Sequence, residues 1–312
     1  MHLTESAIVH EEHMQAKNER IKSVLKRLAV NSGRSATIID GLTLTRWNIP
    51  DMVDTCFYAP SIGLIVQGRK ESIIGRERFV YGELDCLVNG VDMPSKSRVL
   101  GASPDQPLLA VSLAIDTGLA HEIALETSSV PSASAERRAA HPFGVSVARV
   151  MPDVLDAFTR LVELLEKPDA AALLGPLTVR EIIFRVFMGP QGDTLRMIHA
   201  ADSPDSRIAR AITWLREHYR QPLHVEALAA SVQMATSTFH HQFKRITSLS
   251  PLQFQKQLRL HEAQRLMLVE HMDAGTAGRT VGYESASQFS REYKRIFGEP
   301  PYRSLSRLRN GE

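Results

Sequence analysis

The chain has 312 residues, of which 43% are hydrophobic, and this predicts a globular protein of two domains rather than a disordered one. No apolar run approaches the roughly 20 residues that a membrane span needs. The N-terminus, MHLTESAIVHEEHMQ, has no apolar signal core. With only two cysteines, the sequence predicts a protein of the reducing cytoplasm.

The net charge of +2 conceals an asymmetry along the chain. Residues 207–312 contain 16 lysines and arginines against 9 acidic residues, a net charge of +7. Residues 1–206 contain 21 against 26, a net charge of −5. The basic part fits a polyanionic partner, although a solvated basic surface would explain the charge alone equally well.

The first part of the chain reads as one helix followed by many short strands. Residues 5–31 form a helical pattern that Gly33 ends. Short apolar runs, separated by turn signals, then follow at 42–47, 62–66, 71–74, 78–81, 85–88, 98–100 and 108–115. Strands at this spacing predict a small barrel or a double-sheet roll.

Helices are predicted after the strands. A polar loop at 126–141 precedes helices at 152–166 and 177–188, whose apolar stripes fit either the protein core or a second subunit. A further short helix and the residues around Asp202 and Asp205 form the predicted linker, at 191–206. The predicted domains are therefore an N-terminal helix at 1–34, a sensory and dimerisation domain at 35–190, and a DNA-binding domain at 207–312.

The last part of the chain is helical and contains two predicted helix-turn-helix units. After a helix at 207–219, the pairs at 225–246 and 274–297 flank a connecting helix at 251–269. In the final helix Phe289, Tyr293 and Phe297 recur every four residues and share a buried face. Two such units on a rigid connector can place two recognition helices about one DNA turn, ~34 Å, apart.

Two stretches carry a family resemblance. The pattern V-G-Y-x-S-x-S-x-F-x-R-x-Y-K-x-x-x-G-x-x-P, at 281–301, closely resembles the second helix-turn-helix of AraC/XylS-type transcriptional regulators. The stretch PSIGLIVQGRK, with VYGELDCLVNGVDMP after it, resembles the cupin-like N-terminal domain of one AraC subgroup, over roughly 35–190. The resemblance implies an α+β protein with an N-terminal cupin-like β-barrel and flanking helices. Its C-terminal domain would be all-α, with two helix-turn-helix motifs joined by a long helix.

The sequence departs from the family pattern in each unit. Ala277 and Gly278 stand where the family usually has Ile-Ala, and the glycines at 275 and 278 should each weaken their helix by ~1 kcal/mol. Ala235 replaces the usual serine N-cap, so we expect Thr236 or Ser237 to cap that helix. His241 stands where arginine is common, which leaves the base preference of the first unit open.

The resemblance also implies which residues meet DNA. In the first unit Ser237, His240 and His241 would face bases, with Lys244 and Arg245 on the same side; a wholly solvated role for the two histidines is the alternative. In the second unit the groove-facing residues would be Ala286, Ser287, Gln288 and Arg291, after the expected N-cap Ser285, with Lys294, Arg295 and Arg303 on the phosphate backbone. For each single lysine or arginine, solvation without DNA contact is an equal alternative, except for Arg291, for which DNA contact is favoured.

The predicted barrel lacks the residues of a metal enzyme. Metal-dependent cupins use histidines, and none occurs between Gly33 and Ala120, so we predict no catalytic residue, metal or cofactor. The candidate effector pocket consists of Trp47, Cys56, Phe57, Tyr58 and Ile62, although ordinary core is the commoner role for each. Cys56 and Cys86 are candidates for a redox or electrophile sensor, against the commoner case of buried, unreactive thiols.

These observations predict a sequence-specific DNA-binding transcriptional regulator that a small-molecule effector controls. Its expected partners are duplex promoter DNA, RNA polymerase and a second copy of the chain, with no membrane. The alternative is a DNA-binding dimer whose N-terminal part is purely structural. An enzyme with a cysteine acceptor fused to a DNA-binding module is disfavoured, because residues 87–312 contain no cysteine.

Overall fold

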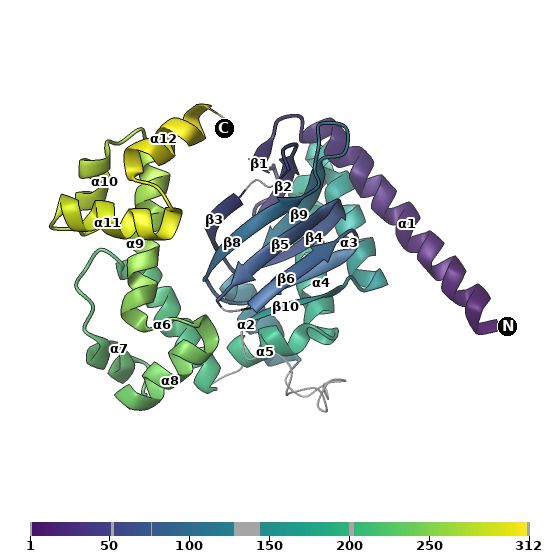
Figure 1. Ribbon diagram of the computed structural model, residues 1–312. Coiled ribbons are helices and arrows are strands. Elements are labelled where there is room, and N and C mark those ends of the chain that lie inside the picture. The colour runs from purple at the N-terminus through teal and green to yellow at the C-terminus, as the bar shows by residue number, and fades with distance from the viewer. Residues whose placement is uncertain (1, 51–52, 76, 128–143, 200–202, 311–312) are drawn as a thin grey trace. The chain divides into compact units, whose positions relative to one another are not determined.

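The computed structural model describes residues 2–50, 53–75, 77–127, 144–199 and 203–310 (Figure 1). Two compact units make up the chain. The first comprises Met1–Asp54, Tyr58–Val91 and Lys96–Ser203, and the second comprises Thr55–Phe57, Asp92–Ser95 and Pro204–Glu312. No helix within these described residues is long and apolar enough to cross a bilayer.

Two antiparallel sheets form the β structure of the N-terminal part. One sheet has the strand order β1-β2-β9-β4-β7-β10 and the other has the order β3-β8-β5-β6. The strands are β1 Gly33–Ala36, β2 Leu42–Trp47, β3 Val53–Tyr58, β4 Ser61–Gln67, β5 Arg69–Ile74, β6 Glu77–Gly82, β7 Asp85–Asn89, β8 Met93–Leu100, β9 Leu108–Ala114 and β10 Val145–Arg149. This confirms the α+β class; the sheets form a double-sheet roll, and the barrel is not closed.

The buried residues of neighbouring strands alternate along the chain. Ile62, Leu64 and Val66 of β4 lie in one buried cluster with alternate residues of its neighbour β9, such as Val111 and Leu113. All seven predicted strands are present, with shifts of up to five residues at their ends, the largest at the start of β8. The strands β1, β3 and β10 were not predicted; β1, with the sequence GRSA, is largely exposed and has no apolar alternation to reveal it.

Five α-helices accompany the sheets among the described residues. They are α1 His2–Leu28, α2 Thr117–Glu126, α3 Pro152–Glu163, which a 3-10 turn at Leu164–Glu166 extends, α4 Pro168–Met188 and α5 Gly192–His199. Helix α3 contacts both α1 and α4, and Figure 1 shows the three beside the strands. Helix α4 begins nine residues before the predicted start at 177, because Pro168 occupies its first turn and the helix continues through Pro176. Most of the predicted loop at 126–141 lies outside the described residues.

The second unit contains seven helices among its described residues. They are α6 Pro204–His218, α7 Val225–Ser231, α8 Thr236–Thr247, α9 Pro251–Val269, α10 Ala274–Thr280, α11 Ala286–Phe297 and α12 Pro301–Asn310. The first six agree with the predicted helices to within a few residues. Helix α12 was missed, because Pro301 reads as a stop although proline is also favoured in the first turn of a helix.

Candidate nucleic-acid interface

Helices α8 and α11 repeat the same arrangement of buried and exposed residues fifty positions apart. Phe239 and Phe243 of α8 are buried, as are Phe289 and Tyr293 at the corresponding positions of α11. Each helix has twelve residues and ends with a lysine and an arginine in its last turn. The two helices share the internal repeat FHHQFKRI and FSREYKRI, which is visible in the sequence.

The outer face of α8 is polar and exposed. Ser237, His240, His241 and Lys244 are all exposed there. Arg245 differs, because it is half-buried and forms an ion pair with Asp205 at the start of α6 while donating to Gln242 at 2.6 Å. Within the protein, then, the charge of Arg245 is already compensated.

The start of α8 has no side-chain cap. Ala235 is the N-cap residue, with extended backbone angles, and no side chain bonds the free N–H groups of the first turn. The expectation that Thr236 or Ser237 would cap this helix is therefore wrong. Because both residues lie within the helix, their hydroxyls are past the N-cap position from which a side chain reaches the first N–H groups.

Helix α11 has a side-chain cap and a continuous exposed face. Ser285 is the N-cap, as predicted, and its hydroxyl accepts from the N–H of Gln288 at 3.3 Å. The other predicted residues of this helix, Ala286, Ser287, Arg291, Lys294 and Arg295, are exposed. Arg303, on α12, is also exposed. The structure thus places a polar N-terminal turn and a basic C-terminal turn on one accessible surface.

The second helix-turn-helix motif requires two glycines, Gly278 in α10 and Gly282 in the turn. Gly278 lies under the ring of Phe289, where a Cβ atom would come within 3.0 Å of the ring carbon Cγ. Gly282 has a φ of +95°, and a Cβ atom there would lie 2.5 Å from the carbonyl oxygen of Arg220. Helix α10 forms in spite of its glycines; the Asp273 side chain caps it by accepting from the N–H of Thr276 at 2.9 Å.

Arg259 of the connecting helix α9 joins the segment that follows α6 to the turn of the second helix-turn-helix motif. Its guanidinium donates to the carbonyl oxygens of Tyr219 at 2.7 Å, Gly282 at 3.0 Å, Gln221 at 3.0 Å and Arg220 at 3.1 Å. Burial lowers the pKa of Arg259 from its usual value, but a guanidinium remains charged. One side chain therefore holds the end of α6 against the turn between α10 and α11.

A second network joins α9 to α11 itself. Lys256 Nζ lies 2.8 Å from Glu292 Oε1, and the Tyr283 hydroxyl donates to Glu292 Oε2 at 2.8 Å. Burial favours a higher pKa for the Glu292 carboxyl, but the hydrogen bonds from Lys256, Tyr283 and Gln288 outweigh it, so the pKa lies below its usual value. The carboxylate is ionised at neutral pH and fixes α11 on the connecting helix.

Two family models match consecutive parts of the chain. The AraC-type transcriptional regulator N-terminus matches residues 38–194, and a helix-turn-helix domain matches residues 228–307. The chain belongs to the AraC-type transcriptional regulators. The predicted resemblance is thereby confirmed for both parts.

Individual relatives are more distant. The transcriptional activator RhaS of Escherichia fergusonii is 26% identical over 154 residues, and RhaS of Salmonella schwarzengrund is 26% identical over 156; each match covers 49% of this chain and 55% of the relative. The chain thus matches about half the length of these curated relatives. The fold is similar to that of ToxT from Vibrio cholerae in a crystal structure with a bound unsaturated fatty acid, with a TM-score of 0.60, 10% identity, and coverage of 85% of this chain and 95% of ToxT.

In this AraC-type chain the five predicted pocket residues lie on three strands. Trp47 is on β2, Ile62 is buried on β4, and Cys56, Phe57 and Tyr58 are on β3. Cys56 and Phe57 belong to the second compact unit, and the other three belong to the first. A shared pocket for these five residues stays a prediction.

Tyr58 belongs to a cluster of hydroxyl groups in the first unit. Its oxygen lies 2.5 Å from Ser97 Oγ and 3.3 Å from Ser72 Oγ, and Ser72 Oγ lies 2.9 Å from the Tyr81 hydroxyl. Ser72, Ser97 and Tyr81 are buried. Sequence reasoning selected Tyr58 alone, because a cluster drawn from four strands has no local spacing that marks it.

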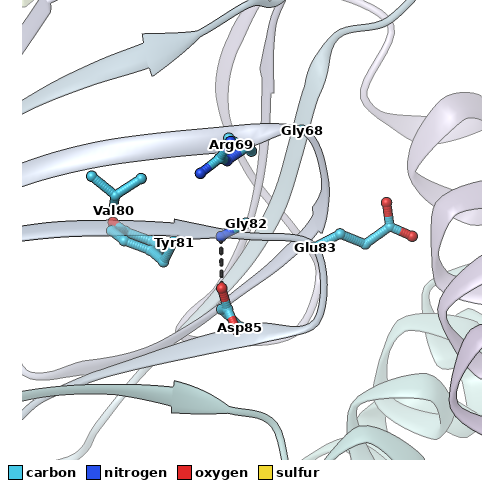
Figure 2. A pocket seen from close by; sticks show the side chains of 7 residues that line it. All are labelled: Gly68, Arg69, Val80, Tyr81, Gly82, Glu83 and Asp85. Atoms are coloured by element: carbon cyan, nitrogen blue, oxygen red, sulfur yellow. Dashed lines mark hydrogen bonds between the residues drawn. The ribbon is translucent and has the colours of Figure 1, made fainter. Parts of the chain in front are cut away.

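A surface hollow lies beside Tyr81, at the ends of β5, β6 and β7 (Figure 2). Its lining residues are Gly68, Arg69, Val80, Tyr81, Gly82, Glu83 and Asp85. The N–H of Gly82 donates to Asp85 Oδ2 at 2.8 Å, and Glu83 accepts from Asn18 of α1 at 2.8 Å. The polar lining of this hollow differs from the apolar chemistry predicted around Trp47.

The structure separates the two cysteines, and neither forms a disulfide. Cys86 is buried. Burial, with a smaller contribution from the charge of Asp85, raises the pKa of its thiol to about 12. Such a thiol is protonated at neutral pH and is unsuited to sensing. Cys56 is half-buried. Among the described residues there is no group of three or more histidine, cysteine or acidic side chains that could hold a metal.

Proposed function

We propose that this chain is a sequence-specific DNA-binding transcriptional regulator. The observation that carries the proposal is the pair of recognition helices, α8 and α11, each with an exposed polar and basic face. The unit that carries them has a net charge of +7 over residues 207–312. Such a surface attracts the phosphate backbone, while side chains on the helix faces read base edges in the major groove.

The second recognition helix offers the clearest assignment of roles. Arg291 is exposed near the middle of α11, where its guanidinium could pair with guanine, and Ala286 could contact a thymine methyl group. Lys294 and Arg295, in the last turn, suit phosphate contacts. In α8, Ser237, His240, His241 and Lys244 remain the proposed contact residues, and the ion pair with Asp205 makes Arg245 the weakest of the set.

The test is binding of the full chain to a duplex selected by it from a random pool, compared with random duplex across a salt series. Both affinities should fall steeply with salt. Arg291→Ala should weaken the selected site by ~1–3 kcal/mol and relax one base preference, whereas Lys294→Ala should weaken both duplexes equally. Arg265→Ala is the charge-matched control, because this residue lies on α9 in ion pairs with Glu262 and Glu270. If no duplex binds even at low salt, the proposal is wrong.

We further propose that a small, largely apolar effector binds the first unit near Trp47 and Tyr58. The ToxT structure with an unsaturated fatty acid, on a similar fold, supports this class of ligand. An effector controls DNA binding only if it binds one state of the protein better than another. A coupling of ~1–3 kcal/mol would change DNA affinity roughly 5- to 150-fold, and the selected DNA would change effector affinity by the same factor.

Tryptophan fluorescence can test this coupling. Trp47 and Trp214 are the only tryptophans, so Trp214→Phe leaves Trp47 as the reporter. A library of fatty acids and other apolar metabolites is titrated with and without the selected duplex. Equal ligand affinities in the two series would exclude control of DNA affinity and favour the alternative, a DNA-binding dimer with a structural N-terminal part.

A homodimer is proposed from the exposed face of α4. Leu173, Leu177 and Phe184 are 76%, 65% and 43% exposed along this helix, although its opposite face is in the core. A helix that is apolar on both faces is normally covered. The same stripe on a second copy is self-complementary, and Arg180 between these residues is already paired with Glu122 and Glu126.

The dimer test is sedimentation of Leu177→Glu beside Ile73→Glu. Ile73, on β5, is 41% exposed and lies outside the stripe, so its substitution introduces the same charge elsewhere. We expect the first variant to lower the sedimentation coefficient and the second to leave it unchanged. A wild-type monomer at all concentrations would contradict the proposal. RNA polymerase as a partner, a cytoplasmic location and the absence of catalysis are parts of the same proposal.

A further inference from the structure

Glu292 of α11 is hydrogen-bonded to a residue proposed to read DNA. Gln288 lies one helical turn earlier on the exposed face, and its Nε2 donates to Glu292 Oε1 at 3.2 Å. The Glu292 side chain is only 15% exposed, in contrast to the exposed Gln288. The two residues thus connect the surface of the recognition helix to a fixed carboxylate beneath it.

The chemistry of this pair determines which end of the Gln288 amide faces Glu292. An ionised carboxylate only accepts hydrogen bonds, so the NH₂ end must point toward it and the carbonyl end must point away. The amide keeps one N–H and its carbonyl oxygen free. These are one donor and one acceptor, the pair that binds N7 and the N6 amino group of adenine in the major groove.

We propose that Glu292 is a positioning residue that fixes the Gln288 amide in one orientation for reading adenine. The inference rests on the proposed DNA-binding function. A glutamine without such a partner can rotate its amide, which exchanges donor and acceptor at the base edge and weakens discrimination. Holding the amide before DNA arrives removes that freedom in advance.

The carboxylate is itself held from two directions. Lys256 of α9 bonds Oε1 at 2.8 Å, and Tyr283 from the preceding turn bonds Oε2 at 2.8 Å. In α8 the residues that correspond to Glu292 and Gln288 are Gln242 and Thr238. Gln242 accepts from Arg245, so the orienting pair occurs only in the second helix-turn-helix motif among these described residues. Base discrimination by the second helix-turn-helix motif therefore depends on Glu292, which need not touch DNA.

The experiment measures base preference with the full chain. The base pair read by Gln288 is identified as the one whose preference changes in Gln288→Ala, and binding is then measured to the four duplexes that differ there. Glu292→Gln, which can present either an acceptor or a donor, should lower the preference for adenine about tenfold. Glu284→Gln, the same charge change at an exposed residue of the preceding turn, should leave that preference unchanged.

Two further variants distinguish positioning from folding. Lys256→Met and Tyr283→Phe keep the carboxylate but loosen it, and should lower the same preference by a smaller factor. In the Gln288→Ala background, Glu292→Gln should have no further effect on base preference, which a general loss of structure would not predict.

The outcomes separate this inference from the proposed function. If the wild type binds no DNA, both fail. The inference alone is overturned if the wild type selects a site but no base preference depends on Gln288. It is also overturned if that preference is unchanged in folded Glu292→Gln protein.

Discussion

Replacing Arg259 by methionine should destabilise the second compact unit more than replacing any exposed charged residue of the same helix. The variant keeps most of the apolar stem but removes donors from four carbonyl groups. Gln255 still donates to the carbonyls of Tyr219 and Gln221, and water can reach that of Arg220. The carbonyl of Gly282 loses its charged donor. At about 1.5–3 kcal/mol for a hydrogen bond to a charged group, we expect a loss of about 1.5–3 kcal/mol of unfolding free energy.

The assay is urea unfolding followed by Trp214 fluorescence. Trp47→Phe removes the other tryptophan, and Trp214 lies on α6, whose end Arg259 holds. The matched control is Arg265→Met, also on α9, whose ion pairs with Glu262 and Glu270 are partly exposed to solvent and should contribute less than about 1 kcal/mol. If both variants lower the unfolding free energy equally, the structural role assigned to Arg259 is wrong.

Three further predictions follow from single residues. Burial is the main cause, and the charge of His121 the smaller one, that lowers the pKa of His199 from 6.5 to about 4. Over this range the unfolded chain binds a proton that the folded chain does not, so the free energy of unfolding should fall by about 3 kcal/mol as the pH drops from about 6.5 to about 4. His199→Gln should remove this loss when unfolding is followed by Trp47 fluorescence. An unchanged dependence of stability on pH in the variant would refute the assignment to His199. Cys86, with its pKa raised to about 12, should resist alkylation at pH 8 until the protein unfolds; native labelling at the rate of a free thiol would contradict this. Gly282→Ala should lower stability by about 2 kcal/mol or more, because of its φ of +95° and the nearby Arg220 carbonyl, and a neutral result would refute the strain argument.

Several elements could be predicted because their signals are local. Helix α9 begins and ends at the predicted residues, and β2 matches its predicted run. Apolar periodicity and nearby proline or serine residues mark these boundaries within a few positions. Elements without such signals were missed: β1 has no alternation, and α12 begins at a proline that reads equally well as a stop.

The sequence by itself determined the family, the α+β class and most of the exposed residues of both recognition helices. These depend on short-range spacing, such as Phe289 and Tyr293 on one side of a helix and Arg291 on the other. Only the tertiary structure decided which of those residues are held and by what. Arg259 contacts residues 23 to 40 positions away, and Glu292 meets Lys256 across 36 positions. No local period encodes such pairs, because they exist only when packing brings separate helices together.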